Sequence, residues 1–102
     1  MRSIFEVLAE PHRREILALL REGERPAGDL VERLGIAQPT VSKHLKLLRE
    51  HGLVTVRQDA QRRLYRLSPE PLRELETWLA PYRTLWSDRL TALETHLNKM
   101  PN

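Results

Sequence analysis

Apolar residues recur at helical spacing through the first half of the chain and predict four helices. The second begins near Pro11, since proline has no N–H to lose in a first turn, and is expected to end at Gly23 in a left-handed conformation. The third is expected to end at Gly35, and the fourth to run from Gln38 to Gly52. The apolar positions behind this prediction are Ile4, Phe5, Val7, Leu8, Ile16, Leu17, Leu19, Leu20, Leu30, Val31, Leu34, Val41, Leu45 and Leu48.

The pattern changes in the second half of the chain. Residues 53–67 alternate apolar and polar side chains around a turn at residues 59–61, which predicts a two-stranded hairpin. Residues 70–99 carry one wide apolar stripe and predict a long terminal helix. Pro81 lies inside this stripe and is expected to kink or break the helix, because proline removes a hydrogen bond and crowds the preceding turn. Residues 24–26 are expected to form a loop.

The fourth helix has two chemically different sides. Val41, Leu45 and Leu48 fall in one sector and are expected to face a core, whereas Lys43 and Lys46 lie opposite. A short helix, a turn of about three residues and a second helix of this kind match the helix-turn-helix arrangement, whose second helix enters the major groove. The side chains expected to contact DNA from this helix are Gln38, Pro39, Thr40, Ser42, Lys43, His44 and Lys46.

Positive charge gathers where this helix and the hairpin lie. The net charge is +3, but residues 36–66 hold seven basic and two acidic residues, hence +5, while the remainder holds ten basic and twelve acidic, hence −2. Such a concentration indicates an anionic partner, although solvated charges also cluster by chance. On the hairpin, Arg57, Arg62 and Arg63 are expected to contact DNA as a wing. The alternative is that they only protect an exposed strand edge.

Other kinds of chemistry have little support in the sequence. The chain has no cysteine, which excludes disulfides, thiol nucleophiles and thiolate metal sites. Ser42 and His44 are two positions apart on one helix and therefore point in different directions, so they do not form a nucleophile and base pair. There is no apolar run of about 20 residues for a membrane span and no secretory signal. We expect a cytoplasmic protein with no enzymatic activity, cofactor or membrane partner.

Several segments together resemble the ArsR family of bacterial winged helix-turn-helix repressors, namely residues 8–20, 29–54 and 62–67. Residues 78–90 are similar to its SdpR-like branch, which lacks the metal-binding cysteines. The resemblance implies a mainly α fold with a small β-hairpin (α+β) and a homodimer that binds double-stranded DNA at an inverted-repeat operator and represses transcription. It implies one domain over residues 1–102, with the helix-turn-helix at 27–51, the wing at 53–67 and a dimerisation helix at 70–99.

Two positions depart from the family pattern. Ala37 stands where a serine cap is common, which weakens the helix start by about 1 kcal/mol. Ala60 stands at the wing tip, where glycine is usual, so the turn type stays open. Carried over by position, the groove-reading set would be Gln38, Thr40, Ser42, Lys43 and His44, with Arg62 and Arg63 on the wing.

Alternatives to a metal-independent DNA-binding repressor remain. A metal-responsive repressor would have to use Asp88 and His96, which are eight residues apart and would need a partner chain, so no metal site is expected. His12, His44 and His51 show no ligand spacing with one another. A winged helix can instead bind a protein, in which case the interaction would be insensitive to salt. No residue identifies a small-molecule effector.

The terminal helix carries more apolar surface than a small domain can cover. Trp78, Tyr82 and Trp86 repeat every four residues, and each can bury about 150–250 Å². We expect two chains to share this surface in a self-complementary interface; the alternative is that the helix folds back on its own domain. The expected interface residues are Ile4, Phe5, Leu8, Trp78, Tyr82, Leu85, Trp86, Leu90 and Leu93.

Overall fold

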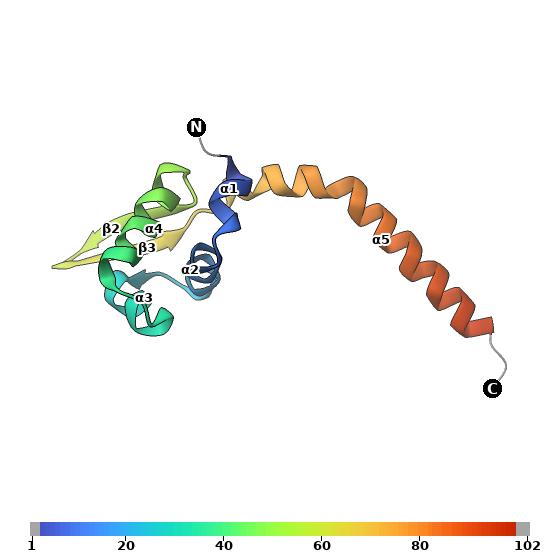
Figure 1. Ribbon diagram of the computed structural model, residues 1–102, viewed down its shortest axis with the longest axis horizontal. Helices are drawn as coiled ribbons and strands as arrows, with labels where there is room; N and C mark the ends of the chain where they lie inside the picture. Colours follow the sequence, from blue (N-terminus) through green and yellow to red (C-terminus); the bar gives the residue numbers. More distant parts are fainter. Residues whose placement is uncertain (1–2, 100–102) are drawn as a thin grey trace.

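The fold was obtained as a computed structural model, which describes residues 3–99. Four helices and a small antiparallel sheet pack together, and a long fifth helix leads away from them (Figure 1). The elements are α1 (Ile4–Ala9), α2 (Pro11–Glu22), β1 (Arg25–Pro26), α3 (Ala27–Leu34), α4 (Gln38–Glu50), β2 (Val54–Asp59), β3 (Arg62–Leu67), a 3-10 helix (Glu70–Leu72) and α5 (Arg73–Lys99). This confirms the predicted fold class, a mainly α winged helix-turn-helix with a small sheet.

Local signals explain where the helices begin and end. The Glu10 side chain accepts a hydrogen bond from the Arg13 backbone N–H at 3.1 Å and so caps α2. Gly35 ends α3 in the left-handed conformation (φ 67°), as predicted. Gly23 also follows the end of α2, as predicted, but its φ of 155° and ψ of 165° are far from the predicted left-handed helical conformation. The chain must turn there directly into a strand.

That strand, β1, is a correction to the sequence analysis, which expected residues 24–26 to form a loop. Arg25 and Pro26 pair antiparallel with Tyr65 and Leu64 of β3, so the sheet has three strands in the order β1-β3-β2. Two residues are too few to show the alternation by which strands are recognised. Only the packing of β1 beside β3 reveals it.

The wing tip is a tighter turn than expected. Asp59 belongs to β2 and pairs with Arg62 of β3, which leaves Ala60 and Gln61 as a two-residue connection. Ala60 has φ 56°, a region that costs a residue with a Cβ roughly 1–2 kcal/mol. This is the physical consequence of alanine at a position where glycine would be unstrained.

The core lies between α1 to α4 and the sheet. Its side chains come from every one of these helices, which is why four short amphipathic helices are stable together. Its members are Ile4, Val7, Ile16, Leu17, Leu20, Leu30, Val41, Leu45, Leu48, Leu53, Val54 and Tyr65.

Helix α5 extends beyond this core. It is continuous from Arg73 to Lys99, so of the two outcomes predicted at Pro81 the break does not occur, while the ribbon changes direction in the first half of the helix, as a kink would produce (Figure 1). Only its first turns are covered, because Leu75, like Leu72 just before it, packs against the core. The radius of gyration is 18.9 Å, against about 13 Å for a compact chain of this length.

Candidate nucleic-acid interface

The inner face of α4 is locked into the core and leaves the opposite face open. Val41, Leu45 and Leu48 are at most 1% exposed, as the sequence predicted. Their burial fixes the rotation of the helix about its axis, and therefore which side chains face outward. Those predicted DNA-contacting residues that lie exposed on α4 are Gln38, Pro39, Thr40, Ser42, Lys43 and Lys46.

The beginning of α4 has no side-chain cap. Ala37 precedes the helix and makes no side-chain capping bond, in line with the weakened start expected from the sequence. Pro39 has no N–H, and the Thr40 N–H donates to the Ala37 carbonyl oxygen at 3.0 Å, so the first turn leaves few backbone donors open. The exposed side chains of Gln38 and Thr40, together with the partial positive charge of a helix start, are compatible with an anionic partner.

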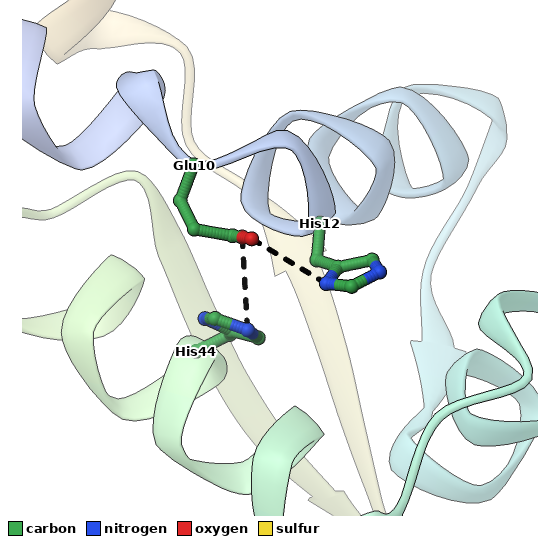
Figure 2. Close-up of side chains that lie close together, drawn as sticks. All are labelled: Glu10, His12 and His44. Carbon is green, nitrogen blue, oxygen red and sulfur yellow. Dashed lines mark ion pairs between the residues drawn. The ribbon is translucent and has the colours of Figure 1, made fainter.

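His44 is the exception on α4 and corrects the expected groove-reading set. Its side chain is 13% exposed and faces the start of α2, where its Nε2 lies 3.7 Å from Glu10 Oε2 (Figure 2). Arg13 Nη1 lies 3.4 Å from the other ring nitrogen, Nδ1. The periodicity of α4 places His44 between its inner and outer faces, and only the position of α2 decides that the ring points inward.

The charges around His44 are interdependent. Burial lowers the pKa of His44. The Glu10 carboxylate raises this pKa, and the charges of Arg13 and His12 lower it further. Burial alone would raise the pKa of Glu10, yet the Arg13 backbone N–H and the charges of His44 and His12 lower it. A largely neutral imidazole therefore lies beside an ionised carboxylate at neutral pH.

The wing arginines divide into two kinds. Arg57 forms a two-pronged ion pair with Glu24, with Nη2 to Oε1 at 2.5 Å and Nε to Oε2 at 3.0 Å. The hydrogen bond from Arg57 lowers the pKa of Glu24. Arg57, expected to contact DNA, therefore already has a partner for its charge within the chain, although its side chain is 52% exposed. The sequence could not show this, since the partners are 33 residues apart.

Arg62 and Arg63 are less committed. Arg62 lies 3.8 Å from Asp59, with both side chains at least half exposed. Arg63 lies over the Tyr65 ring at 5.8 Å from its centroid. Exposed pairs of this kind contribute little and exchange readily for another anion. Among the predicted DNA-contacting residues, these two arginines at the wing tip and Lys43 and Lys46 carry the available positive charge.

An ionic network at the start of α3 was missed by the sequence analysis. Asp29 accepts hydrogen bonds from Arg25 at 2.7 Å and from Arg33 at 3.0 Å, and the bond from Arg25 is the main reason its pKa is lowered. Arg25 also bonds the Leu19 carbonyl oxygen at 3.1 Å. The spacing of four residues between each arginine and Asp29 was a usable signal. The network joins α2, β1 and α3.

The apolar stripe of α5 is uncovered. Trp78, Tyr82 and Trp86 are 44–55% exposed. Phe5 of α1 meets Trp78 in an edge-to-face contact with ring centroids 5.8 Å apart and is itself exposed. Ile4 is 3% exposed, so its expected place in an interface is wrong: α1 turns it into the core. The other expected interface residues that remain wholly or partly accessible are Leu8, Leu85, Leu90 and Leu93.

Asp88 and His96 are both exposed on α5. Among residues 3–99, neither belongs to a group of three close metal-ligand side chains. None of the helices described is long and apolar enough to cross a membrane.

Comparison with known proteins agrees with this geometry. A helix-turn-helix domain family matches residues 8–57. The transcriptional repressor SdpR of Bacillus subtilis is 32% identical over 79 residues, which cover 78% of this chain and 88% of SdpR. The chain belongs to the ArsR family of winged helix-turn-helix transcriptional repressors. Similarity to SdpR over most of both chains, with no cysteine present, agrees with the SdpR-like branch.

Solved structures of the ArsR family share the fold along most of the chain. A crystal structure of a "possible transcriptional regulator for arsenical resistance" has a TM-score of 0.70 and 38% identity, covering 90% of this chain and 96% of that one. A homodimeric winged helix-turn-helix DNA-binding domain from Mycobacterium bovis has a TM-score of 0.62 and 30% identity, covering 78% and 73%. As an ArsR-family member, the protein is a DNA-binding transcriptional repressor rather than an enzyme.

Proposed function

We propose that this ArsR-family repressor acts as a homodimer that binds an inverted-repeat operator, with α4 in the major groove and the wing on the adjacent backbone. The observation that carries the proposal is the fixed outward face of α4, where Gln38, Ser42 and Lys46 are exposed opposite a fully buried side. Amide and hydroxyl groups can read base edges, whereas lysine supplies phosphate or guanine contacts.

The proposed dimer rests on α5. A large apolar surface exposed to water is unfavourable, and a monomeric protein seldom leaves one uncovered. A second copy of the chain is the occupant that fits, because the homodimeric Mycobacterium bovis relative has the same fold. Two-fold symmetry would place two copies of α4 about 34 Å apart, one helical turn of DNA, which explains the expected symmetry of the operator.

Operator fragments selected from the source genome with purified protein provide the test. Binding measured by fluorescence anisotropy at several salt concentrations should weaken with a log-log slope near −0.9 per phosphate neutralised. A single symmetric sequence should be recovered, with one dimer bound per site. An interaction that does not respond to salt, or that requires a protein instead of DNA, would contradict the proposal and favour a protein-binding winged helix.

Substitutions on α4 distinguish base-specific recognition from non-specific electrostatic attraction to the phosphates. Gln38→Ala should relax discrimination at one base pair by about 1–3 kcal/mol, whereas Lys46→Ala should weaken all sequences alike and reduce the salt slope by about one. Arg21→Ala, on the exposed surface of α2 outside α4 and the wing, is the matched control and should change neither. Equal losses on operator and random duplex for Gln38→Ala would argue against direct base reading.

The proposal includes no metal-controlled release through Asp88 and His96 of α5. Asp88 and His96 lie exposed on one helix, and the chain has no cysteine. Native protein and Asp88→Ala should therefore have the same operator affinity as each other, both in the absence and in the presence of Zn²⁺. A Zn²⁺-dependent loss of affinity that Asp88→Ala removes would instead support the metal-responsive alternative.

A further inference from the structure

Three metal-ligand side chains converge where the start of α2 meets α4 (Figure 2). His12 Nδ1 lies 3.4 Å from Glu10 Oε1, and His44 Nε2 lies 3.7 Å from Glu10 Oε2. One ligand atom from each residue lies within 4.8 Å of the others. Among residues 3–99 this is the one group of at least three such side chains so arranged.

The donor set has a defined chemical preference. Two imidazole nitrogens and one carboxylate oxygen suit borderline divalent transition metals such as Zn²⁺, and three protein ligands leave a fourth position for water. Zn–N distances of about 2.0–2.1 Å in a tetrahedron place ligand atoms about 3.3 Å apart. The two contacts of Glu10 are near this separation but use different carboxylate oxygens, so the three ligand atoms must draw together from a spread of up to 4.8 Å to hold an ion.

The surroundings are partly favourable and partly opposed to a cation. The side chains of His44, Glu10 and His12 are 13%, 32% and 38% exposed, so the group is sheltered on the α4 side and open on the His12 side. Burial keeps the pKa of His44 low, and the neutral imidazole is the form that binds a metal. The low pKa of Glu10 keeps its carboxylate ionised.

Arg13 is the main opposing group. Its Nη1 lies 3.4 Å from His44 Nδ1, which must carry a proton once Nε2 binds a metal, so this guanidinium contact would be lost. Arg13 has other anchors, since its Nε bonds the Val7 carbonyl oxygen at 2.5 Å and its Nη2 the Glu6 carbonyl oxygen at 3.2 Å. Its positive charge selects for metals that bind imidazole strongly over Mg²⁺ or Ca²⁺.

We propose that Glu10, His12 and His44 bind one divalent transition-metal ion, with Zn²⁺ as the reference, and that this ion ties the recognition helix α4 to the start of α2. The site is separate from Asp88 and His96 of α5. It uses none of the exposed DNA-contacting residues, so it stands or fails independently of the proposed function.

Isothermal titration of the chelator-treated, untagged protein with ZnCl₂ tests the site. The expected result is one Zn²⁺ per chain, with affinity reduced at least tenfold by His12→Ala and by Glu10→Gln. Glu10→Gln retains an oxygen that can cap α2, and His12 is the most exposed of the three, so both variants should fold, which circular dichroism can check. His96→Ala is the matched control and should bind like the native protein.

Histidine side-chain NMR adds a second measurement, which would not respond to Zn²⁺ if His12 and His44 had only a structural role. On adding Zn²⁺, the ring signals of His12 and His44 should shift, and those of His51 and His96 should stay. The melting temperature should rise with Zn²⁺ in the native protein and not in His12→Ala. Absence of binding, equal Zn²⁺ affinity in native and His12→Ala protein, or a loss caused by His96→Ala instead would overturn the proposal.

Discussion

Helices α4 and α5 are both amphipathic, yet their apolar sides have opposite fates. On α4, Val41, Leu45 and Leu48 are at most 1% exposed, whereas Trp78 and the large apolar side chains of α5 from Tyr82 onward are 44–62% exposed. Both helices carry apolar residues at helical spacing, although the periodicity is stronger in α4. Periodicity therefore predicts that a helix has an apolar face, but not which surface covers that face.

The difference follows from what surrounds each helix. Helix α4 is enclosed by α2, α3 and β2, whereas α5 leaves the body after its first turns (Figure 1). Phe5 of α1 contacts Trp78 near the start of the stripe, and the large apolar side chains from Tyr82 onward are at least 44% exposed. Its 27 residues span about 40 Å at 1.5 Å per residue. The apolar face of α4 is thus buried in the core of its own chain, whereas that of α5 stays exposed and is available for the proposed dimer.

The largest effect is expected in the covered region. Leu45→Ala should lower the free energy of unfolding by about 2–5 kcal/mol at every protein concentration, because it leaves a cavity in a closely packed core. Leu85→Ala makes the same chemical change on α5, where the side chain is 52% exposed, and its cost should depend on protein concentration. Urea unfolding at two concentrations measures both. Equal, concentration-independent costs would abolish the distinction between the two helices.

The next effect concerns the uncovered region. Trp86→Ala should weaken dimerisation by about 2 kcal/mol or more, as for a large aromatic side chain at the centre of an interface. That is roughly a 30-fold loss of affinity, measurable by sedimentation. Leu93→Ala should act in the same direction, and Thr91→Ala, on the opposite side of the helix, should have no effect. A tight dimer that persists in both Trp86→Ala and Leu93→Ala would refute the assigned interface.

The smallest effect is expected for ion pairs, one in the folded body at Asp29 and one on exposed α5 at Glu76. Arg25 lowers the pKa of Asp29 in the folded protein, so Asp29 contributes stability above its unfolded pKa of about 3.9 and loses it as pH falls through the lower folded value. Asp29→Asn should therefore lower the melting temperature at pH 7, and the difference from the native protein should shrink below about pH 4.

Glu76→Gln is the control for this comparison, because Glu76 pairs with Arg83 at 3.4 Å on exposed α5. It should leave the melting curve nearly unchanged at both pH values. A difference between native and Asp29→Asn protein that grew toward low pH would mean that Asp29 opposes folding.

Much of the fold could be predicted because its signals are local. Pro11, Gly35 and the alternation from Val54 each act within a few residues of where they occur. The predictions that failed concern long-range contacts. Strand β1 is a strand only because β3 lies beside it, Ile4 is buried because α1 folds onto the body, and Arg57 pairs with Glu24 of the connection between α2 and β1.

By itself, the sequence determined the order of the elements, the buried side of α4, the positive charge near it and the resemblance to ArsR-family repressors. Only the tertiary structure decided that α5 stays uncovered and that His44 points away from the exposed face, toward Glu10 and His12. The histidines of this group are 32 positions apart in the chain. Spacing rules describe neighbours within a turn or a strand pair, whereas contacts between elements depend on how their apolar faces pack together.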